Sequence, residues 1–148
     1  TNEIRDRMIK ELGGIEGYAF HECDTNDLQD TTAVFRSYMN DSVFALCPRG
    51  YGNVSYRMYE ALQMGRIPVY ISDSFWLPFQ EFIDWERAAL LISPDEIHTI
   101  PDRIDELLQS EKYLDYLSYG RHVYENHTSW DGCLKTIARI IQYDDHKE

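Results

Sequence analysis

The sequence predicts an α/β protein in which a Rossmann-like parallel sheet is flanked by helices. The apolar run 43–46 precedes a loop with two glycines, a helical pattern through Met64 and a second apolar run at 67–71. Strand, loop, helix and strand in this order make a βαβ unit. Segments with apolar residues at helical spacing precede and follow it. A chain of 148 residues can bury a core, so we expect residues 1–148 to form one domain.

Two helices and a short strand are expected before the βαβ unit. Residues 3–12 carry apolar side chains at helical spacing, and the glycine pair that follows ends this helix. Residues 18–20 are a strand candidate, and residues 21–24 are interpreted as a polar loop rather than a metal site. Residues 28–39 are predicted to form a second helix, with Val34, Phe35, Tyr38 and Met39 facing inward.

The βαβ unit is bounded by residues with clear conformational preferences. Asn53 is expected to cap its helix and Gly65 to close it. Asp73 leaves the second strand at its carboxyl end, where it either approaches the substrates or caps a following helix. The apolar segment 75–79 comes next, and for Trp76 core packing is favoured over a role as a sugar-stacking platform.

The C-terminal part of the sequence predicts a further strand and three helices. Residues 88–92 are an apolar strand candidate, followed by a turn at 93–96. Pro101 suits the first turn of a helix, and another helix is expected over residues 111–125. The last helix has one apolar stripe, which contains Trp130, Cys133, Leu134, Ile137, Ala138 and Ile141.

The loop inside the βαβ unit is suited to an anion. Gly50 and Gly52 permit backbone conformations and close approaches that a side chain would block. The first amides of the next helix lack intrahelical partners and carry the positive end of its dipole. Ser55 adds a hydroxyl, and Arg49 and Arg57 flank this terminus. The loop is either a phosphate or nucleotide site or an ordinary βαβ connection, because its glycine spacing matches neither the dinucleotide fingerprint nor the P-loop.

Glu60 lies three residues after Arg57 and therefore shares its helix face. A carboxylate one turn from a phosphate site can accept hydrogen bonds from a ribose. The same two side chains can instead form an ordinary surface ion pair, worth under about 1 kcal/mol.

The residues from Cys47 to Val69 resemble the signature of the exostosin-type glycosyltransferases. The matching pattern is Cys-Pro-Arg-Gly-x-Gly-x-x-Ser-x-Arg-x-x-Glu-Ala-Leu-x-x-Gly-x-Ile-Pro-Val, followed by Asp73 and by Leu77-Pro78-Phe79. The dense match covers residues 42–85, and a looser match in element order extends over nearly the whole chain. Members of this family use nucleotide sugars, typically UDP-sugars, and have the two-lobed GT-B fold.

The resemblance implies that the chain is the C-terminal, donor-binding lobe of such an enzyme, with the acceptor lobe absent. It implies that Ser55 and Arg57 face the diphosphate and Glu60 the ribose. Enzymes of this fold commonly draw their base from the other lobe, so the base is unknown, with Asp73 as the candidate here. The predicted donor nucleotide site comprises Arg49, Gly50, Tyr51, Gly52, Ser55, Arg57 and Glu60.

Composition narrows the partners and cofactors. The formal net charge of −12 argues against nonspecific binding of nucleic acid. No Cys/His pattern suggests zinc. No Asp-x-Asp occurs, which fits a GT-B enzyme that neutralises its leaving diphosphate without a metal, so no cofactor is expected. The resemblance leaves localisation open: the Golgi lumen for a fragment of an animal or plant enzyme, the cytoplasm for a bacterial or viral one.

Two functions of different classes remain. The first is the donor lobe of an enzyme that transfers a sugar from a nucleoside diphosphate to a hydroxyl of a glycan acceptor. The second is a noncatalytic module, derived from that lobe, which binds a nucleotide or a partner protein. Ser55, Arg57 and Glu60 favour the first, because a degenerate copy would be free to lose them. Without the N-terminal lobe, we expect the chain to be inactive and to form a homodimer through exposed apolar surface.

Overall fold

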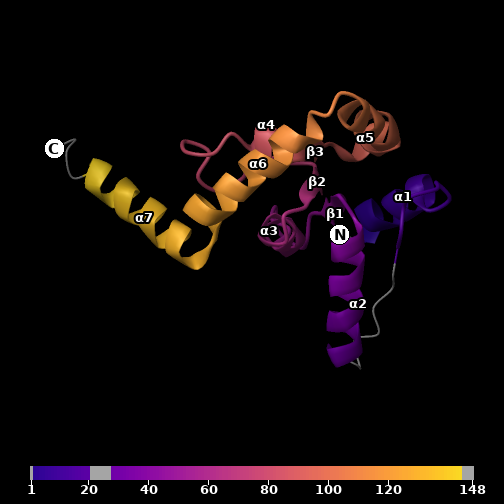
Figure 1. Ribbon diagram of the computed structural model, residues 1–148, viewed down its shortest axis with the longest axis horizontal. Helices are drawn as coiled ribbons and strands as arrows, with labels where there is room; N and C mark the ends of the chain where they lie inside the picture. Colours follow the sequence, from indigo (N-terminus) through magenta and orange to yellow (C-terminus); the bar gives the residue numbers. More distant parts are fainter. Residues whose placement is uncertain (1, 21–27, 145–148) are drawn as a thin grey trace.

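The computed structural model of the chain describes residues 2–20 and 28–144, and the side chains of residues 3–20 and 32–142. A small parallel sheet lies at the centre, with helices on both of its faces (Figure 1). Two helices extend away from this body, α2 (Leu28–Asp41) and α7 (Trp130–Asp144) (Figure 1).

The sheet has three strands in the order β1-β2-β3. They are β1 (Phe44–Pro48), β2 (Ile67–Ile71) and β3 (Leu90–Ile92). Both neighbouring pairs are parallel, and β2 is buried along its whole length. Full burial is typical of the central strand in a parallel sheet that is covered on both faces. The predicted α/β class is therefore confirmed.

Helices alternate with the strands and fill the gaps between them in the sequence. The remaining helices of the described residues are α1 (Asn2–Leu12), α3 (Tyr56–Gln63), α4 (Trp85–Ala88), the 3₁₀ helix η1 (Pro94–Thr99), α5 (Ile100–Gln109), α6 (Tyr113–Val123) and the π-helix η2 (Tyr124–Thr128). The predicted βαβ unit thus corresponds to β1, α3 and β2.

Alternate side chains of β2 enter two separate cores. Tyr70 lies in the core that contains Met58 and Leu62 of α3. Val69 and Ile71 lie in the other core, on the opposite face. The first core also takes Trp85 and Ala88 of α4 and Val123 of α6, and the second takes Ile4, Met8 and Leu12 of α1 and Ile100 and Leu107 of α5. Each fully buried large aliphatic side chain stabilises the fold by about 1.5–3 kcal/mol.

Several local predictions differ from the structure. Residues 18–20 form no strand, although Tyr18 and Phe20 pack against the second core. The expected strand at 88–92 is shortened to β3, because the residues before it close the helical turn α4. The turn at 93–96 is the start of η1, which Ser93 and Glu96 cap reciprocally. The segment 21–24 lies outside the described residues.

Two aromatic side chains expected in the core are exposed. Trp76 is 65% exposed and Tyr38 is 42% exposed, so the predictions of core packing for Trp76 and of an inward position for Tyr38 are both wrong. Trp76 belongs to an irregular segment between β2 and α4, in which Leu77 rather than Trp76 enters the first core.

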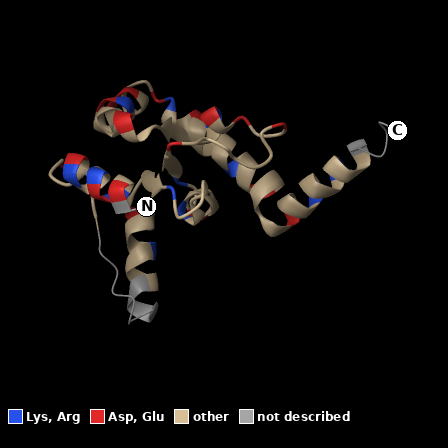
Figure 2. Ribbon diagram, turned by 180° about the vertical axis from the view of Figure 1, so that it is seen from behind, with Lys and Arg blue, Asp and Glu red and all other residues tan. Residues whose placement is uncertain are grey.

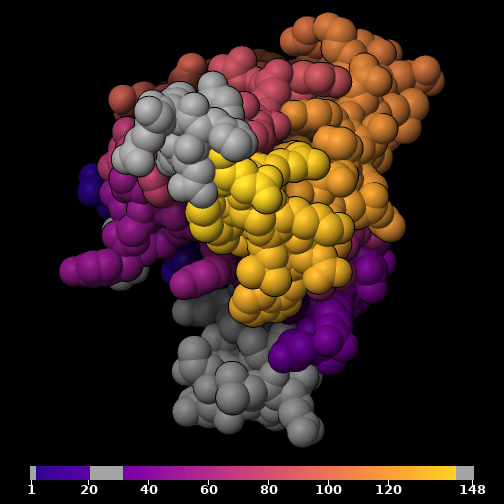
Figure 3. Space-filling model, turned by 90° about the vertical axis from the view of Figure 1, so that its left-hand side faces the viewer, coloured from indigo at the N-terminus to yellow at the C-terminus, as the bar shows by residue number. Residues whose placement is uncertain are grey.

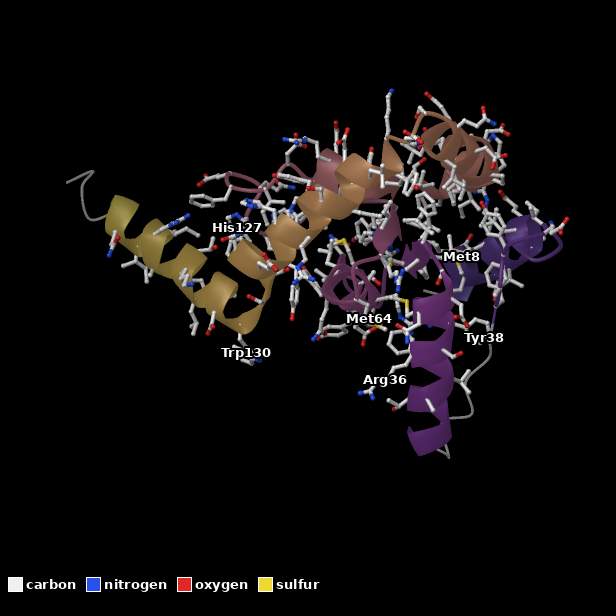
Figure 4. The ribbon with its side chains drawn as sticks, in the orientation of Figure 1. Met8, Arg36, Tyr38, Met64, His127 and Trp130 are labelled. Atoms are coloured by element: carbon white, nitrogen blue, oxygen red, sulfur yellow. The ribbon has the colours of Figure 1, made fainter. Side chains whose placement is uncertain are left out.

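A tightly packed elbow joins η2 to α7. His127 lies at this elbow (Figure 4). It is buried, and its Nδ1 lies 3.0 Å from Oγ1 of Thr136. A side chain at Gly132 would meet the backbone of Asn126 and His127 at 2.6 Å, so this approach requires glycine.

Beyond the elbow, α7 leaves its apolar stripe uncovered. Trp130 points away from the rest of the protein (Figure 4), and the side view shows α7 as an outer layer of the molecule (Figure 3). The exposed fractions along the stripe are 85% for Trp130, 60% for Leu134, 42% for Ile137 and 58% for Ile141. None of the described helices combines the length and the apolar character needed to cross a bilayer.

Candidate functional site

The candidate site lies at the carboxyl edge of the sheet. Because the strands are parallel, the segments after β1 and β2 leave the sheet at the same edge. The Arg49 amide donates to the Ile71 carbonyl at 2.9 Å, which extends the β1–β2 pairing into the first residue of the loop. The loop 49–55 and the segment 72–74 are therefore neighbours, as the sequence predicted.

Arg49 and Asp73 form a two-pronged ion pair across this edge. Nε of Arg49 lies 2.6 Å from Oδ1 of Asp73, and Nη2 donates to Oδ2 at 2.9 Å. Arg49 is thus held in place and largely neutralised by a carboxylate. Asp73 caps no helix, because an irregular segment and a turn follow it, so that alternative is wrong. Both residues were predicted to lie at this edge, but their pairing was not.

The backbone of the loop is fixed from the β2 side. The Tyr70 hydroxyl donates to the Asn53 carbonyl, and Nδ2 of Asn53 lies 3.5 Å from Oγ of Ser74. Within the loop, the Gly50 amide donates to the Val54 carbonyl at 3.2 Å. Asn53 had been expected to cap α3, and this prediction is wrong. Its backbone instead joins the loop to β2.

The two glycines have different surroundings. A Cβ at Gly50 would lie 3.3 Å from the Val54 carbonyl oxygen, and a Cβ at Gly52 would meet nothing within 4 Å. Neither residue has a positive φ, so the expected need for unusual backbone conformations is wrong. Gly52 instead leaves open space above the loop.

Ser55 is the N-cap of α3, in extended conformation at φ −112° and ψ 118°. Its side chain is 6% exposed and makes no capping hydrogen bond. The first amides of an α-helix have no intrahelical partner. The start of α3 thus carries backbone donors and one serine hydroxyl directly after the loop in the chain, where the helix dipole favours an anion.

Arg57 and Glu60 form a weaker ion pair on the exposed face of α3. Nε of Arg57 lies 3.2 Å from Oε2 of Glu60, and each side chain is 46% exposed. The Arg57 guanidinium also lies 4.2 Å from the centre of the Phe35 ring of α2. Burial raises the pKa of the Cys47 thiol. The charge of Arg57 opposes this rise and that of Glu60 adds to it, so the electrostatic influence of both residues reaches the end of β1. Contact between Phe35 and Arg57 was not predicted, because helical spacing does not reveal contacts between helices.

Two tyrosines project from the loop and the start of α3. Tyr51, which was among the predicted site residues, is 100% exposed, and Tyr56 is 85% exposed. Tyr56 was missed, because it lies between motif positions and carries no charge. Flat, amphipathic rings at the rim of a site are suited to covering an aromatic or sugar ring.

The described residues contain no group of three or more His, Cys, Asp or Glu side chains placed to hold a metal ion. The electropositive groups at the site are Arg57, Arg49 and the amides of α3.

These features define a class: an α/β protein with a glycine-bearing loop between a strand and a helix, at the carboxyl edge of a parallel sheet. Residues 1–108 match the family described as the Exostosin GT47 domain. The chain therefore belongs to the exostosin family, which confirms the resemblance drawn from residues 42–85.

Individual relatives agree with this assignment. Exostosin-1 of Drosophila melanogaster is 37% identical over 102 residues, which is 64% of this chain and 13% of the relative. The Exostosin-1 homolog of Caenorhabditis elegans is 36% identical over 117 residues, 72% of this chain and 30% of the relative. Exostosin-1a of Danio rerio is 36% identical over 127 residues, which is 80% of this chain and 15% of the relative. The matched segments are thus less than a third of the length of these relatives.

Proposed function

We propose that this chain is the donor-binding lobe of a two-lobed glycosyltransferase and that it binds the nucleoside diphosphate of a nucleotide sugar, UDP first among them. The observation that carries the proposal is the start of α3, which follows a glycine loop with open space at Gly52 and carries an N-cap serine without a capping bond, amides that lack intrahelical partners, and Arg57 in its first turn. Membership of the exostosin family supports the same ligand class.

The diphosphate would lie against the first turn of α3. The helix dipole contributes about 0.3–1 kcal/mol to an anion there, and a charge-assisted hydrogen bond about 1.5–3 kcal/mol. Arg57 is the more available cation, because its contact with Glu60 is single and half-exposed, whereas Asp73 holds Arg49 by two contacts. Donors fixed in this way favour the departing diphosphate over the bound sugar ester, since negative charge grows on it as the glycosidic bond breaks.

Glu60 would accept hydrogen bonds from the ribose, one helical turn from the phosphates. Binding would then release Glu60 from Arg57, whose exposed pairing costs little to break. Tyr51 lies at the rim, fully exposed, and is positioned to cover the base or the sugar.

Transfer requires a second wall of the cleft. The acceptor hydroxyl must be held in line with the anomeric carbon while a base removes its proton, and such positioning is worth about 7–11 kcal/mol. Asp73 is engaged by Arg49, so we assign the base to the N-terminal lobe. The exposed stripe of α7 is suited to contact that lobe, and in the isolated chain it would instead promote homodimers. A noncatalytic nucleotide-binding module would show the same binding, and no turnover in the presence of that lobe.

Two-dimensional NMR with UDP tests the proposed site. Saturable shifts are expected at amides from Gly50 to Arg57 and at Glu60, while amides of α7 remain unchanged. Shifts confined to other parts of the protein, or none with UDP at millimolar concentration, would contradict the proposal.

A further inference from the structure

A groove of about 670 Å³ lies beside the candidate donor site, between the segment 75–84, α4 and α6. Its lining includes the aromatic residues Phe75, Phe82 and Tyr119 and the acidic residues Glu81, Asp84 and Glu86. Because Arg87 and His122 already pack on the Tyr119 ring, Phe75 and Phe82 are the rings that a ligand would meet. Its size falls in the range of about 300–1,000 Å³ that is typical of small-molecule sites.

The groove adjoins the donor loop. The ring of Phe75 lies 6.2 Å from that of Tyr70, in an edge-on arrangement. The Tyr70 hydroxyl in turn donates to the carbonyl of Asn53. Asp73, two residues before Phe75, pairs with Arg49 at the first residue of the loop. A ligand in the groove would therefore lie next to a sugar donor bound at the loop.

The groove is built from an irregular segment that is nevertheless fixed. Nε1 of Trp85 donates to the carbonyl of Pro78 at 2.8 Å, and the Asp84 amide donates to the Tyr119 hydroxyl at 3.1 Å. Nε2 of Gln80 donates to the carbonyl of Phe75 at 3.0 Å. Such a segment is pre-organised, so a ligand would lose little affinity in ordering it.

Phe79 adds backbone strain to this segment. Its φ of 56° is unfavourable for a bulky residue, and its carbonyl accepts the amides of Phe82 at 2.8 Å and Ile83 at 2.9 Å. The surrounding bonds impose this conformation, and backbone strain of this kind clusters at ligand-binding sites.

Aromatic rings stay exposed here at a cost in buried apolar area. Trp76 is 65% exposed, and Phe75 and Phe82, which line the groove, are 37% and 36% exposed. An aromatic face is electron-rich and matches the polarised C–H groups of a sugar ring, while carboxylates accept hydrogen bonds from sugar hydroxyls. Aromatic faces beside hydroxyl-accepting side chains are thus the chemistry that recognises a glycan.

The charge of the groove restricts that glycan. Acidic residues occupy the segment between β2 and α4 and the start of α4 (Figure 2), where Glu81, Asp84 and Glu86 line the groove. Arg87 of α4, whose guanidinium lies 4.4 Å from the centre of the Tyr119 ring, is one cation against these three carboxylates. A uronate or sulfate group placed there would therefore meet a net negative charge, which disfavours it.

We propose that this groove is an acceptor subsite for a neutral glycan, a role that rests on the donor function proposed above. Phe75 and Phe82 stack on sugar rings, and the three carboxylates accept hydroxyl protons and exclude acidic sugars.

Fluorescence titration tests the subsite in a Trp130→Phe background. Trp130 lies on α7, so its removal leaves Trp85, which lines the groove, and Trp76, which lies beside it in the chain, as reporters. Neutral tetrasaccharides of glucose, xylose and N-acetylglucosamine are compared with tetragalacturonate. We expect at least one neutral tetrasaccharide to bind and tetragalacturonate not to bind. Phe82→Ala should weaken the neutral ligand about tenfold, as expected for an aromatic contact, and the control Leu134→Ala should leave it unchanged.

UDP binding is measured on the same samples. UDP binding without neutral-glycan binding would overturn the subsite alone, and glycan binding without UDP binding would overturn the donor function alone. Equal binding of neutral and acidic tetrasaccharides, or an unchanged affinity in Phe82→Ala, would also overturn the subsite. Self-association that Phe82→Ala abolishes would show that a second copy of the chain occupies the groove instead.

Discussion

Replacing Arg57 by alanine distinguishes contacts to the diphosphate from contacts to the nucleoside. The proposed partner of Arg57 is the diphosphate, and a charge-assisted hydrogen bond of this kind contributes about 1.5–3 kcal/mol, or roughly 10- to 150-fold in affinity. In the free protein Arg57 pairs with Glu60 at 3.2 Å. Because that exposed pair is worth only about 0–1 kcal/mol, exchanging it for phosphate leaves a net loss of at least about 0.5 kcal/mol.

Calorimetry with UDP and with uridine measures this difference. We expect Arg57→Ala to weaken UDP by roughly 2- to 150-fold, the factors that correspond to about 0.5–3 kcal/mol, and to leave uridine unchanged, since uridine lacks the charged group. Arg121→Ala is the matched control. Arg121 lies on α6, away from the site, and also pairs with a carboxylate one turn further along the chain, that of Glu125. An equal loss for UDP and uridine, with the fold intact by circular dichroism, would refute the assigned role.

Four further results are expected. Glu60→Gln should weaken UDP and uridine by similar factors, because both contain the ribose that Glu60 is proposed to hold. Leu62→Ala should lower the free energy of unfolding by about 2–5 kcal/mol in chemical denaturation, since Leu62 is 1% exposed in the first core. The isolated chain should release no UDP from UDP-sugars in an acceptor-dependent manner, because it forms one wall of the cleft. Leu134→Glu should shift a dimer toward monomer in sedimentation velocity, because a charge disrupts the apolar stripe of α7.

Each of these results has a clear contrary. A loss confined to UDP in Glu60→Gln would move Glu60 from the ribose to the phosphates. A Leu62→Ala protein as stable as the wild type would mean that the first core repacks at no cost. UDP release well above that of Arg57→Ala would place a base such as Asp73 in this lobe. A wild-type chain that stays monomeric would show that α7 does not associate with itself.

Much of the fold is predictable because its signals are local. The apolar runs 43–46 and 67–71 correspond to strands of a parallel sheet, β1 half-buried and β2 fully buried, and Gly65, with φ 65°, ends α3 as expected. The strand predicted at 18–20 fails, because its apolar side chains pack on the core without a neighbouring strand to pair with in the described residues. Trp76 was misplaced, because an irregular segment has no periodicity from which burial can be inferred.

The candidate site is predictable in position but not in contacts. The carboxyl-edge location of Arg49 and Asp73 follows from parallel strands alone, whereas their ion pair depends on register and rotamers. The N-cap of α3 was mispredicted for the same reason. Asn53 and Ser55 are both good N-cap residues. The Asn53 backbone bonds to Tyr70 and its side chain to Ser74, so Ser55 is the N-cap.

Calorimetric titration of the wild-type chain with UDP, UMP and uridine tests the central claim most directly, that the start of α3 holds a nucleoside diphosphate. Phosphate contacts to the α3 amides, Ser55 and Arg57 predict an affinity that rises from uridine to UMP to UDP. The predicted result is saturable UDP binding that is at least about tenfold tighter than uridine binding. Equal affinities across the series, or no heat from UDP at millimolar concentration, would contradict the claim.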